Sequence, residues 1–142
     1  MDIQQLSDML NKQSGLLGIS ELSNDCRAIE EAAEQGHEGA LLALEVFSYR
    51  LAKYVAAMAV AAGGLDALVF TGGIGENSSL IRAKVVNYCA FLGLQLDEEK
   101  NLAARFGNAG VITADNGGAV AVVIPTNEEL MIAQDTARLS GI

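Results

Sequence analysis

A short apolar run that leads directly into a group of glycines is the feature that most limits what this chain can fold into. Residues Asp66–Phe70 have the length and composition of a strand covered on both faces in a parallel sheet. Gly72, Gly73 and Gly75 follow at once, and glycine permits positive φ and close approach of a ligand. In an open α/β sheet, ligands bind outside the carboxyl ends of strands. The glycine turn is therefore a candidate nucleotide site.

The glycine turn by itself leaves two interpretations open. It contains neither the G-x-G-x-x-G dinucleotide pattern nor a P-loop. A tight strand-to-helix turn that binds nothing explains it equally well. We expect Asn77 or Ser78 to cap a helix that runs to about Leu92, with Gly93 as its stop.

Charge and composition exclude several classes of partner. The 142 residues are 51% hydrophobic and 19% charged, which is typical of one globular domain. The net charge is −9, and no basic stripe exists, which argues against nucleic acid and anionic membranes as partners. The longest apolar stretch, Val55–Leu65, is too short to span a bilayer, and the first residues do not resemble a secretory signal.

Cysteine and histidine give no sign of a metal or redox site. Cys26 and Cys89 are far apart and have no metal-ligand neighbours, so a reducing cytoplasm is the expected compartment. His37 is the only histidine and lies in a polar turn. We expect it on the surface, because metal and catalytic sites need several converging groups.

Helical patterns dominate the first half of the chain. We expect a short helix over Ile3–Asn11, a glycine-punctuated loop over Ser14–Ser20, a helix over Asp25–Gln35 capped by Ser23 or Asn24, and the longest helix over Glu38–Ala62, ended by Gly63 and Gly64. Apolar residues recur along this longest helix at core spacing: Leu44, Phe47, Leu51, Tyr54 or Val55, and Met58. Its alanines allow close packing, in the core or in a subunit contact.

The second half predicts weaker elements around a second strong strand. We expect a brief strand over 94–96 that pairs with 111–113, a helix over Glu98–Phe106, a buried strand over Ala119–Ile124 and a helix over Glu128–Leu139. Thr126 and Glu129 match a capping box. Glu128 then has two interpretations, a magnesium ligand or an acidic residue that stabilises the helix dipole.

The strands predicted over Asp66–Phe70 and Ala119–Ile124 each end in a turn that is a candidate binding segment. If they are parallel, both turns lie at one edge of the sheet, and Gly73–Asn77 and Asn127–Glu129 line one cleft. Phosphoryl transfer needs positive groups that converge on phosphate, and the arginines and lysines here form no cluster. The chain therefore has the character of a part of an enzyme.

Five motifs together resemble the acetate and propionate kinases. They are Ser14–Ser20, Asp25–Arg27, Phe70–Asn77, Asn101–Gly107 and Ile124–Glu129. They occur in the family's order and spacing, and the resemblance covers nearly the whole chain. It implies an α/β fold of the actin, heat-shock 70 and sugar kinase superfamily: a helix-rich, partial ribonuclease-H-like domain with a small, mainly parallel sheet.

The resemblance also implies an activity and a set of binding residues. The family transfers the γ-phosphoryl group of ATP to acetate or propionate, reversibly and with Mg²⁺. Nucleotide contacts carry over onto Asp25, Cys26 and Arg27, and adenosine contacts onto Gly73, Ile74, Gly75, Glu76 and Asn77. The magnesium-site role carries over onto Glu128. Residues 1–142 then correspond to a single, carboxyl-terminal nucleotide-binding domain of a cytoplasmic, dimeric enzyme.

The family's catalytic groups have no counterpart in this sequence. Its catalytic Asp, its transition-state Arg and His and its acyl pocket are expected upstream of Met1. We therefore expect no catalytic residue here and no activity of this chain alone. The acceptor, acetate or propionate, stays open, and so does a different class of function: a free-standing, non-catalytic module for adenine nucleotide binding or dimerisation.

Overall fold

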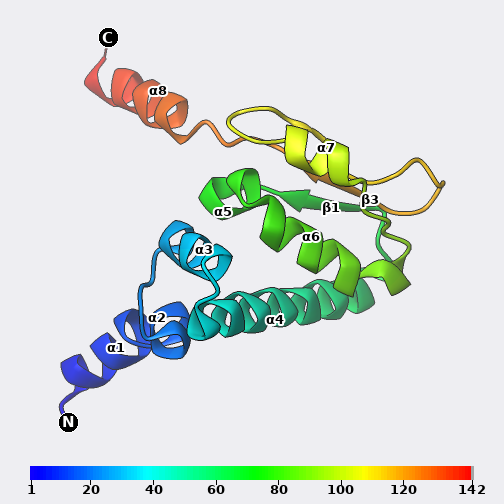
Figure 1. Ribbon diagram of the computed structural model, residues 1–142. Helices are drawn as coiled ribbons and strands as arrows, with labels where there is room; N and C mark the ends of the chain where they lie inside the picture. The colour runs from blue at the N-terminus through cyan, green and yellow to red at the C-terminus, as the bar shows by residue number, and fades with distance from the viewer. Residues whose placement is uncertain (142) are drawn as a thin grey trace.

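Helices form most of the molecule, and a small sheet lies above the longest of them (Figure 1). The computed structural model describes residues 1–141. The helices are α1 (Ile3–Lys12), α2 (Gly15–Ser20), α3 (Cys26–Glu34), α4 (Glu38–Ala62), α5 (Gly72–Asn77), α6 (Ser79–Tyr88), the 3₁₀ turn η1 (Ala90–Leu92), α7 (Glu98–Ala103) and α8 (Glu128–Ser140). The strands are β1 (Ala67–Phe70), β2 (Gly110–Val111) and β3 (Val120–Val123).

The longest helix has the predicted bounds. His37 caps its start, because Nδ1 accepts a hydrogen bond from the Ala40 amide at 3.2 Å. Gly63 ends it with a φ of +77°, a left-handed conformation that glycine adopts without a steric penalty. His37 itself is exposed, as predicted for the surface.

The buried side of α4 is narrower than the predicted stripe. Its buried residues are mostly small: Ala40, Ala43, Leu44, Ser48, Ala52 and Ala59. Phe47, Leu51 and Val55 pack partly buried against the core. Tyr54 and Met58 are exposed, so Val55 is the correct one of the two alternatives Tyr54 and Val55, and the assignment of Met58 to the core was wrong. The small side chains let α2, α3 and α6 approach the α4 backbone closely, and the larger residues are displaced to the rim.

The amino-terminal part contains one helix more than predicted. The first helix was expected and forms α1. The segment Ser14–Ser20, expected as a loop, is the helix α2. Gly18 lies against Gln13, and a Cβ at Gly18 would be 3.0 Å from the Gln13 carbonyl oxygen. Leu16 and Ile19 pack against the core, and this burial overrides the low helix propensity of glycine.

The segment after the first strand is also more helical than expected. The glycine turn is itself the short helix α5. Ser78, one of the two expected caps, begins α6 by accepting a bond from the Ile81 amide at 3.1 Å. After η1 the chain turns at Gly93 with a φ of +91°, at the predicted stop.

The sheet is mixed and has the strand order β1-β3-β2. Strands β1 and β3 are parallel, with Ala67 opposite Val120 and Phe70 opposite Val123. Strand β2 is antiparallel to β3. The pairing predicted between 94–96 and 111–113 is present as one bridge, between Leu96 and Thr113, and 94–96 is not a strand. The helix predicted over Glu98–Phe106 ends earlier, at Ala103.

One face of this sheet is buried and the other is open. Phe70, Ala121 and Val123 lie in the core with Ile81 and Val85 of α6. On the opposite face Val69 is 49% exposed, and Val111 is 47% exposed. The expectation that the first strand is covered on both faces was therefore wrong for residues 1–141, because the described helices lie on one side of the sheet. Within the same residues no helix is long and apolar enough to cross a membrane.

Candidate functional site

The two strand-to-helix junctions lie side by side at one edge of the sheet. Because β1 and β3 are parallel and in register, their carboxyl ends point the same way. The ladder continues past the strands, with the Ile124 amide donating to the Phe70 carbonyl at 2.9 Å. The prediction that both junctions meet at one edge is confirmed.

A single carboxylate joins these junctions across 50 residues of sequence. Oε1 of Glu76, in α5, accepts a bond from the Gly72 amide at 2.9 Å. The same oxygen accepts bonds from the Thr126 amide at 2.8 Å and from the Thr126 hydroxyl at 2.9 Å. These bonds, from Thr126 first and then from Gly72, lower the pKa of Glu76 below its usual value. We call the contact between Glu76 and Thr126 the junction bridge.

The three glycines of α5 differ in their backbone conformation and in the space available for a side chain. Gly72 has a φ of +71°, which disfavours any side chain. A Cβ on Gly75 would lie 3.2 Å from the Phe70 backbone carbon. Gly73 has neither constraint, since a Cβ there would meet nothing within 4 Å. The space beside Gly73 is therefore open to a ligand.

A buried arginine holds the same turn from inside the molecule. Arg82, fully buried in α6, donates from one terminal nitrogen to the Gly75 and Glu76 carbonyls, both at 2.9 Å. Its other donors reach Asn101 and the Ala104 carbonyl. Burial, and next the charge of Arg105, lower the pKa of Arg82. The turn therefore has a fixed backbone.

Sequence reasoning treated Arg82 as one of several scattered arginines, although a signal was present. Arg82 lies three and four positions before Val85 and Val86, so it shares their face of the helix. Both valines are fully buried. A cation within an apolar stripe must find internal partners, because burying it without them is costly.

Asn77 connects the glycine turn to the loop after α7. Its Nδ2 donates to the Gly73 carbonyl at 3.0 Å. Its Oδ1 accepts a bond from the Phe106 amide at 3.3 Å. Phe106 has a φ of +54° and is 79% exposed. Ile74, in the same turn, is 38% exposed, so it presents an apolar surface next to the open space at Gly73.

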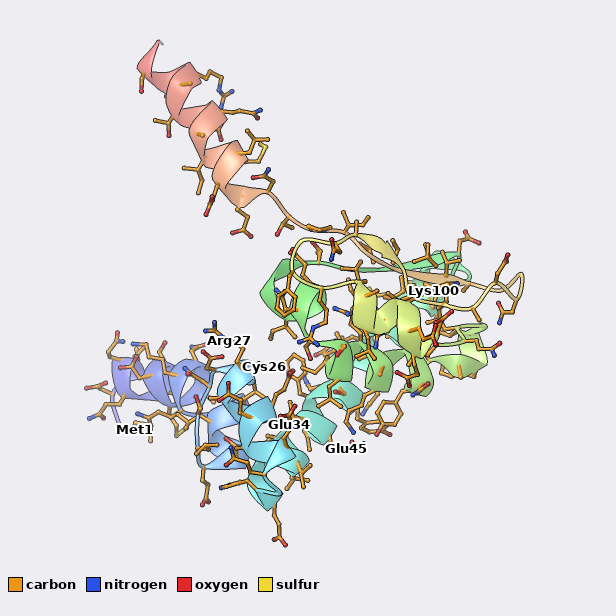
Figure 2. The ribbon with its side chains drawn as sticks, turned by 45° about the horizontal axis from the view of Figure 1, so that its top comes forward. Met1, Cys26, Arg27, Glu34, Glu45 and Lys100 are labelled. Atoms are coloured by element: carbon orange, nitrogen blue, oxygen red, sulfur yellow. The ribbon has the colours of Figure 1, made fainter. Side chains whose placement is uncertain are left out.

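The Asp25–Arg27 segment forms the start of α3. Asp25 caps this helix by accepting from the Arg27 amide at 2.9 Å, so neither Ser23 nor Asn24 is the cap, as had been expected. Arg27 pairs with the Asp25 carboxylate at 2.7 Å, and this hydrogen bond lowers the pKa of Asp25. Arg27 is exposed and lies beside Cys26 at the start of α3 (Figure 2).

Helix α3 is tied to the glycine turn through Glu30. Cys26 is buried, and its thiol donates to Oε1 of Glu30 at 3.6 Å. The hydroxyl of Ser78, the residue after Asn77, donates to the same oxygen. The Cys26 side chain thus points inward, and a ligand can reach this residue only through its backbone. Burial raises the pKa of the Cys26 thiol to about 12.

The start of α8 differs from the predicted capping box. The cap is Asn127, whose Oδ1 accepts from the Leu130 amide at 3.0 Å. Helix α8 begins one residue later than a Thr126 cap would place it, and the Thr126 hydroxyl donates to Glu76 instead. The argument that gave Glu129 a capping role was therefore wrong. Glu128 is exposed in the first turn of α8.

Glu128 has the chemistry of a magnesium ligand but does not form a metal site alone. Within residues 1–141, no group of three His, Cys, Asp or Glu side chains could hold a metal ion. Mg²⁺ in nucleotide sites is usually held by one or two carboxylates together with phosphates and water. The single exposed carboxylate of Glu128 could supply at most one protein ligand to such a site.

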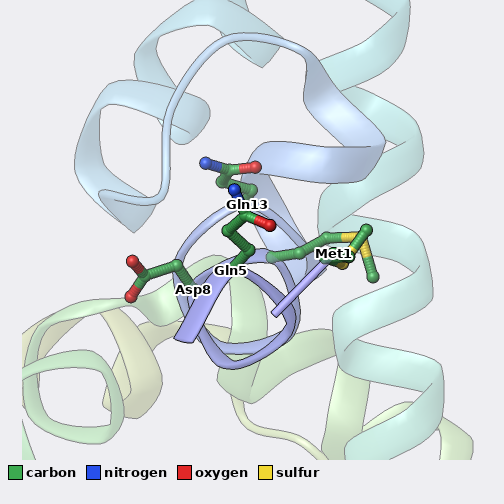
Figure 3. A pocket seen from close by; sticks show the side chains of 5 residues that line it. Met1, Gln5, Asp8 and Gln13 are labelled. Carbon is green, nitrogen blue, oxygen red and sulfur yellow. The ribbon is translucent and has the colours of Figure 1, made fainter. Parts of the chain in front are cut away.

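A shallow hollow near the amino terminus lies apart from these residues. It has a volume of about 440 Å³ and is lined by Met1, Gln5, Asp8, Met9 and Gln13 (Figure 3). None of the predicted binding residues contributes to it. Its lining comes from α1, from Met1 before this helix and from Gln13 after it, so it is not part of the candidate site.

Comparison with known proteins gives the class to which this fold and these junctions correspond. The model of the acetokinase family matches residues 1–134. The chain belongs to the acetokinase family.

Two curated relatives are similar over the entire chain. It is 72% identical over 142 residues to acetate kinase 1 of Neisseria meningitidis serogroup A and 68% identical to the acetate kinase of Chromobacterium violaceum. The chain spans 36% of the length of each of these relatives.

Solved structures agree with this assignment. Acetate kinase from Porphyromonas gingivalis has a TM-score of 0.86 and 43% identity over 97% of this chain and 34% of its own. A propionate kinase from Francisella tularensis has a TM-score of 0.83 and 46% identity, over 94% of this chain and 33% of its own. The superfamily predicted from the motifs is thus confirmed.

Proposed function

We propose that this chain, as a single domain, supplies the adenine-nucleotide-binding part of a kinase that phosphorylates a short-chain carboxylate with ATP. The products are an acyl phosphate and ADP, and the reaction is reversible. The names of the relatives support a carboxylate kinase and leave the acceptor, acetate or propionate, open. The observation that carries the proposal is the pair of bridged junctions, with an open space at Gly73.

Six of the nine predicted residues have a role that their positions allow. Gly73 and Ile74 offer an open backbone and an apolar surface for the adenosine, and Asn77 keeps that turn in shape. Asp25 and Arg27 present charged groups at the start of α3, where Arg27 can exchange its exposed partner for phosphate. Glu128 would hold Mg²⁺, which neutralises phosphate charge when it is bound.

We propose that this chain binds adenine nucleotide but does not catalyse phosphoryl transfer by itself. Transfer of a phosphoryl group needs several positive groups around its oxygens. Arg82 is fully engaged in the core, and Arg27 is paired with the Asp25 carboxylate. We therefore expect a coupled assay to find no acetate-dependent ATP turnover by this chain alone. A kcat above about 1 s⁻¹, ordinary for an enzyme, would contradict this.

Calorimetric titration with ADP and Mg²⁺ tests the nucleotide site. We expect saturable binding that Gly73→Val abolishes while the melting temperature stays unchanged, because a side chain there occupies only the open space. Gly110→Val is the matched control, since Gly110 is equally uncrowded and lies in β2. Loss of binding in both variants, or in neither, would count against a site at Gly73.

The proposed magnesium role of Glu128 can be tested by measuring how much Mg²⁺ increases the affinity for ADP. With Glu128→Gln, we expect Mg²⁺ to increase ADP affinity less than in the unmodified chain, while binding of ADP without Mg²⁺ stays the same. Equal gains in the two proteins would instead favour the role of Glu128 as an acidic residue at the helix start.

A second proposed role is dimerisation, alone or together with nucleotide binding. Leu42, Val46 and Tyr49 of α4 recur at helical spacing and are 56%, 39% and 53% exposed, which is typical of a covered surface. Sedimentation should give a dimer, and Val46→Glu should dissociate it. A monomer at all concentrations would contradict this role. The two buried free thiols are consistent with a cytoplasmic location.

A further inference from the structure

We propose that Glu76 is a positioning residue: through the junction bridge it sets where α8 begins, and so places Glu128 relative to the glycine turn. The inference rests on the proposed nucleotide site and adds a role that differs from direct contact with adenosine. In this view Glu76 couples the nucleotide turn to the magnesium-site residue.

The bond pattern of Glu76 favours this role over ligand contact. One oxygen, Oε1, accepts three bonds at 2.8–2.9 Å, and all three donors belong to the protein. Two of them come from Thr126 and one from Gly72, so the carboxylate spans the gap between the junctions. A ligand that used this oxygen would have to displace the bridge.

The beginning of α8 depends on few other contacts. No residue of α8 is buried, and the helix extends away from the sheet (Figure 1). Between the ladder bond at Ile124 and the cap at Asn127 lie only Pro125 and Thr126. Proline has a restricted φ and no amide donor. Thr126 is therefore the residue through which the body of the protein can fix the helix start.

The other end of the bridge is rigid. The Glu76 carbonyl accepts a hydrogen bond from buried Arg82 at 2.9 Å. The Gly72 amide donates a hydrogen bond to the Glu76 carboxylate. The bridge therefore connects a turn that is fixed in the core to a segment that is exposed. Glu128 follows Thr126 by two residues, so a shift at Thr126 moves it directly.

Two substitutions at Glu76 separate the effect of side-chain length from the effect of side-chain charge. Glu76→Gln retains the side-chain length and an acceptor oxygen but removes the charge. Glu76→Asp retains the charge but is shorter by one methylene, so it cannot span both junctions. Glu129→Gln is the matched control, because it removes one charge from the first turn of α8, where no hydrogen bond of its carboxylate is present in the described chain.

The first measurement is amide hydrogen exchange at Gly72 and Thr126 without nucleotide. We expect exchange at both amides to be at least tenfold faster in Glu76→Asp. Rates in Glu76→Gln should stay within about threefold of the original chain, and those in Glu129→Gln should not change. Equal exchange in the Asp variant and the original chain would overturn the bridge, whether or not the chain binds ADP.

The second measurement is the gain in ADP affinity that Mg²⁺ produces. We expect this gain to be largely lost in Glu76→Asp and retained in Glu76→Gln, while ADP alone binds all variants within about threefold. If Glu76→Gln lost the Mg²⁺-dependent gain in ADP affinity and Glu76→Asp kept it, the gain would depend on the charge of residue 76. This result would overturn the positioning role. If the original chain binds no ADP at all, the proposed nucleotide site fails for this chain, and the exchange result still decides the bridge.

Discussion

Arg82 and Asn101 are joined twice in the core. Nε of Arg82 donates to Oδ1 of Asn101 at 2.8 Å, and a terminal nitrogen donates to the Asn101 carbonyl at 2.7 Å. Three further bonds reach the carbonyls of Gly75, Glu76 and Ala104. Every donor of the guanidinium is used, and none of these acceptors is a carboxylate. The buried charge is thus stabilised by amide and carbonyl dipoles.

Replacement of Arg82 by lysine should destabilise the chain strongly. An ammonium has three donors and cannot reproduce the planar fork, so buried carbonyls lose their partners, and we expect a loss of about 3 kcal/mol or more. Urea unfolding measures it. Arg50→Lys is the control, because Arg50 is exposed on α4, and it should change stability by less than about 0.5 kcal/mol. A similarly small effect for Arg82→Lys would contradict the described network.

Alanine at two neighbouring glycines should have opposite effects on stability. At Gly73 the new methyl group enters open space, and removal of a helical glycine is neutral or stabilising by up to about 1 kcal/mol. At Gly75 it approaches the Phe70 backbone at 3.2 Å, and such overpacking costs about 1–3 kcal/mol. Thermal unfolding of both variants measures the contrast. Equal melting temperatures would show that the two positions are equally free.

Glu76 should contribute to the acid sensitivity of the fold. Because the pKa of Glu76 in the folded chain lies below 4.5, its contribution is fully present above that pH. It is lost as the pH falls through the lower, folded-state value. In urea titrations from pH 7 to pH 3, Glu76→Gln should therefore show a flatter decline of the midpoint than Glu129→Gln. Parallel declines would mean that the bonds to Thr126 and Gly72 do not favour the ionised form.

Both thiols should be unreactive while the chain is folded. Burial raises the pKa of Cys26 to about 12 and also raises that of Cys89, so the thiolate, which is the reactive form, is scarce at pH 8. A disulfide reagent should detect no thiol in the native protein and both after unfolding in urea. Ser140→Cys, at an exposed position of α8, is the positive control and should react at once. Rapid reaction of Cys26 in the native chain would contradict its burial.

The sequence predicted best those helices and strands that are determined by residues within the same segment of chain. The long helix Glu38–Ala62 was predicted with the observed bounds, because its apolar period and the Gly63–Gly64 stop lie within one segment. The two apolar strands were also predicted from their own composition, while their parallel pairing was only assumed and is now shown. The helix at Gly15–Ser20 was missed, since its glycines suggested a loop and its stability comes from packing against α4.

The chemistry of the site was harder to predict, because it depends on contacts between distant residues. The glycine turn and the Thr126–Glu128 segment were both selected from the sequence. The bond between Glu76 and Thr126 was not, since 50 residues separate them. The capping box was wrong because Asn127 caps the helix, one residue later than predicted, while the Thr126 hydroxyl donates to Glu76. The inward direction of Cys26 likewise depends on Glu30 and Ser78.

The parallel pairing of β1 with β3 has a consequence for the order of folding. Helices α2 and α3 each contact α4, which follows them directly in the chain, and such local contacts form fast. The two strands can pair only after a loop of about fifty residues has closed, at an entropic cost of about 3.5 kcal/mol. The glycine turn and Thr126 meet only at that step. The candidate nucleotide site is therefore among the last parts of the chain to assemble, and a folding intermediate with its helices in place would still lack it.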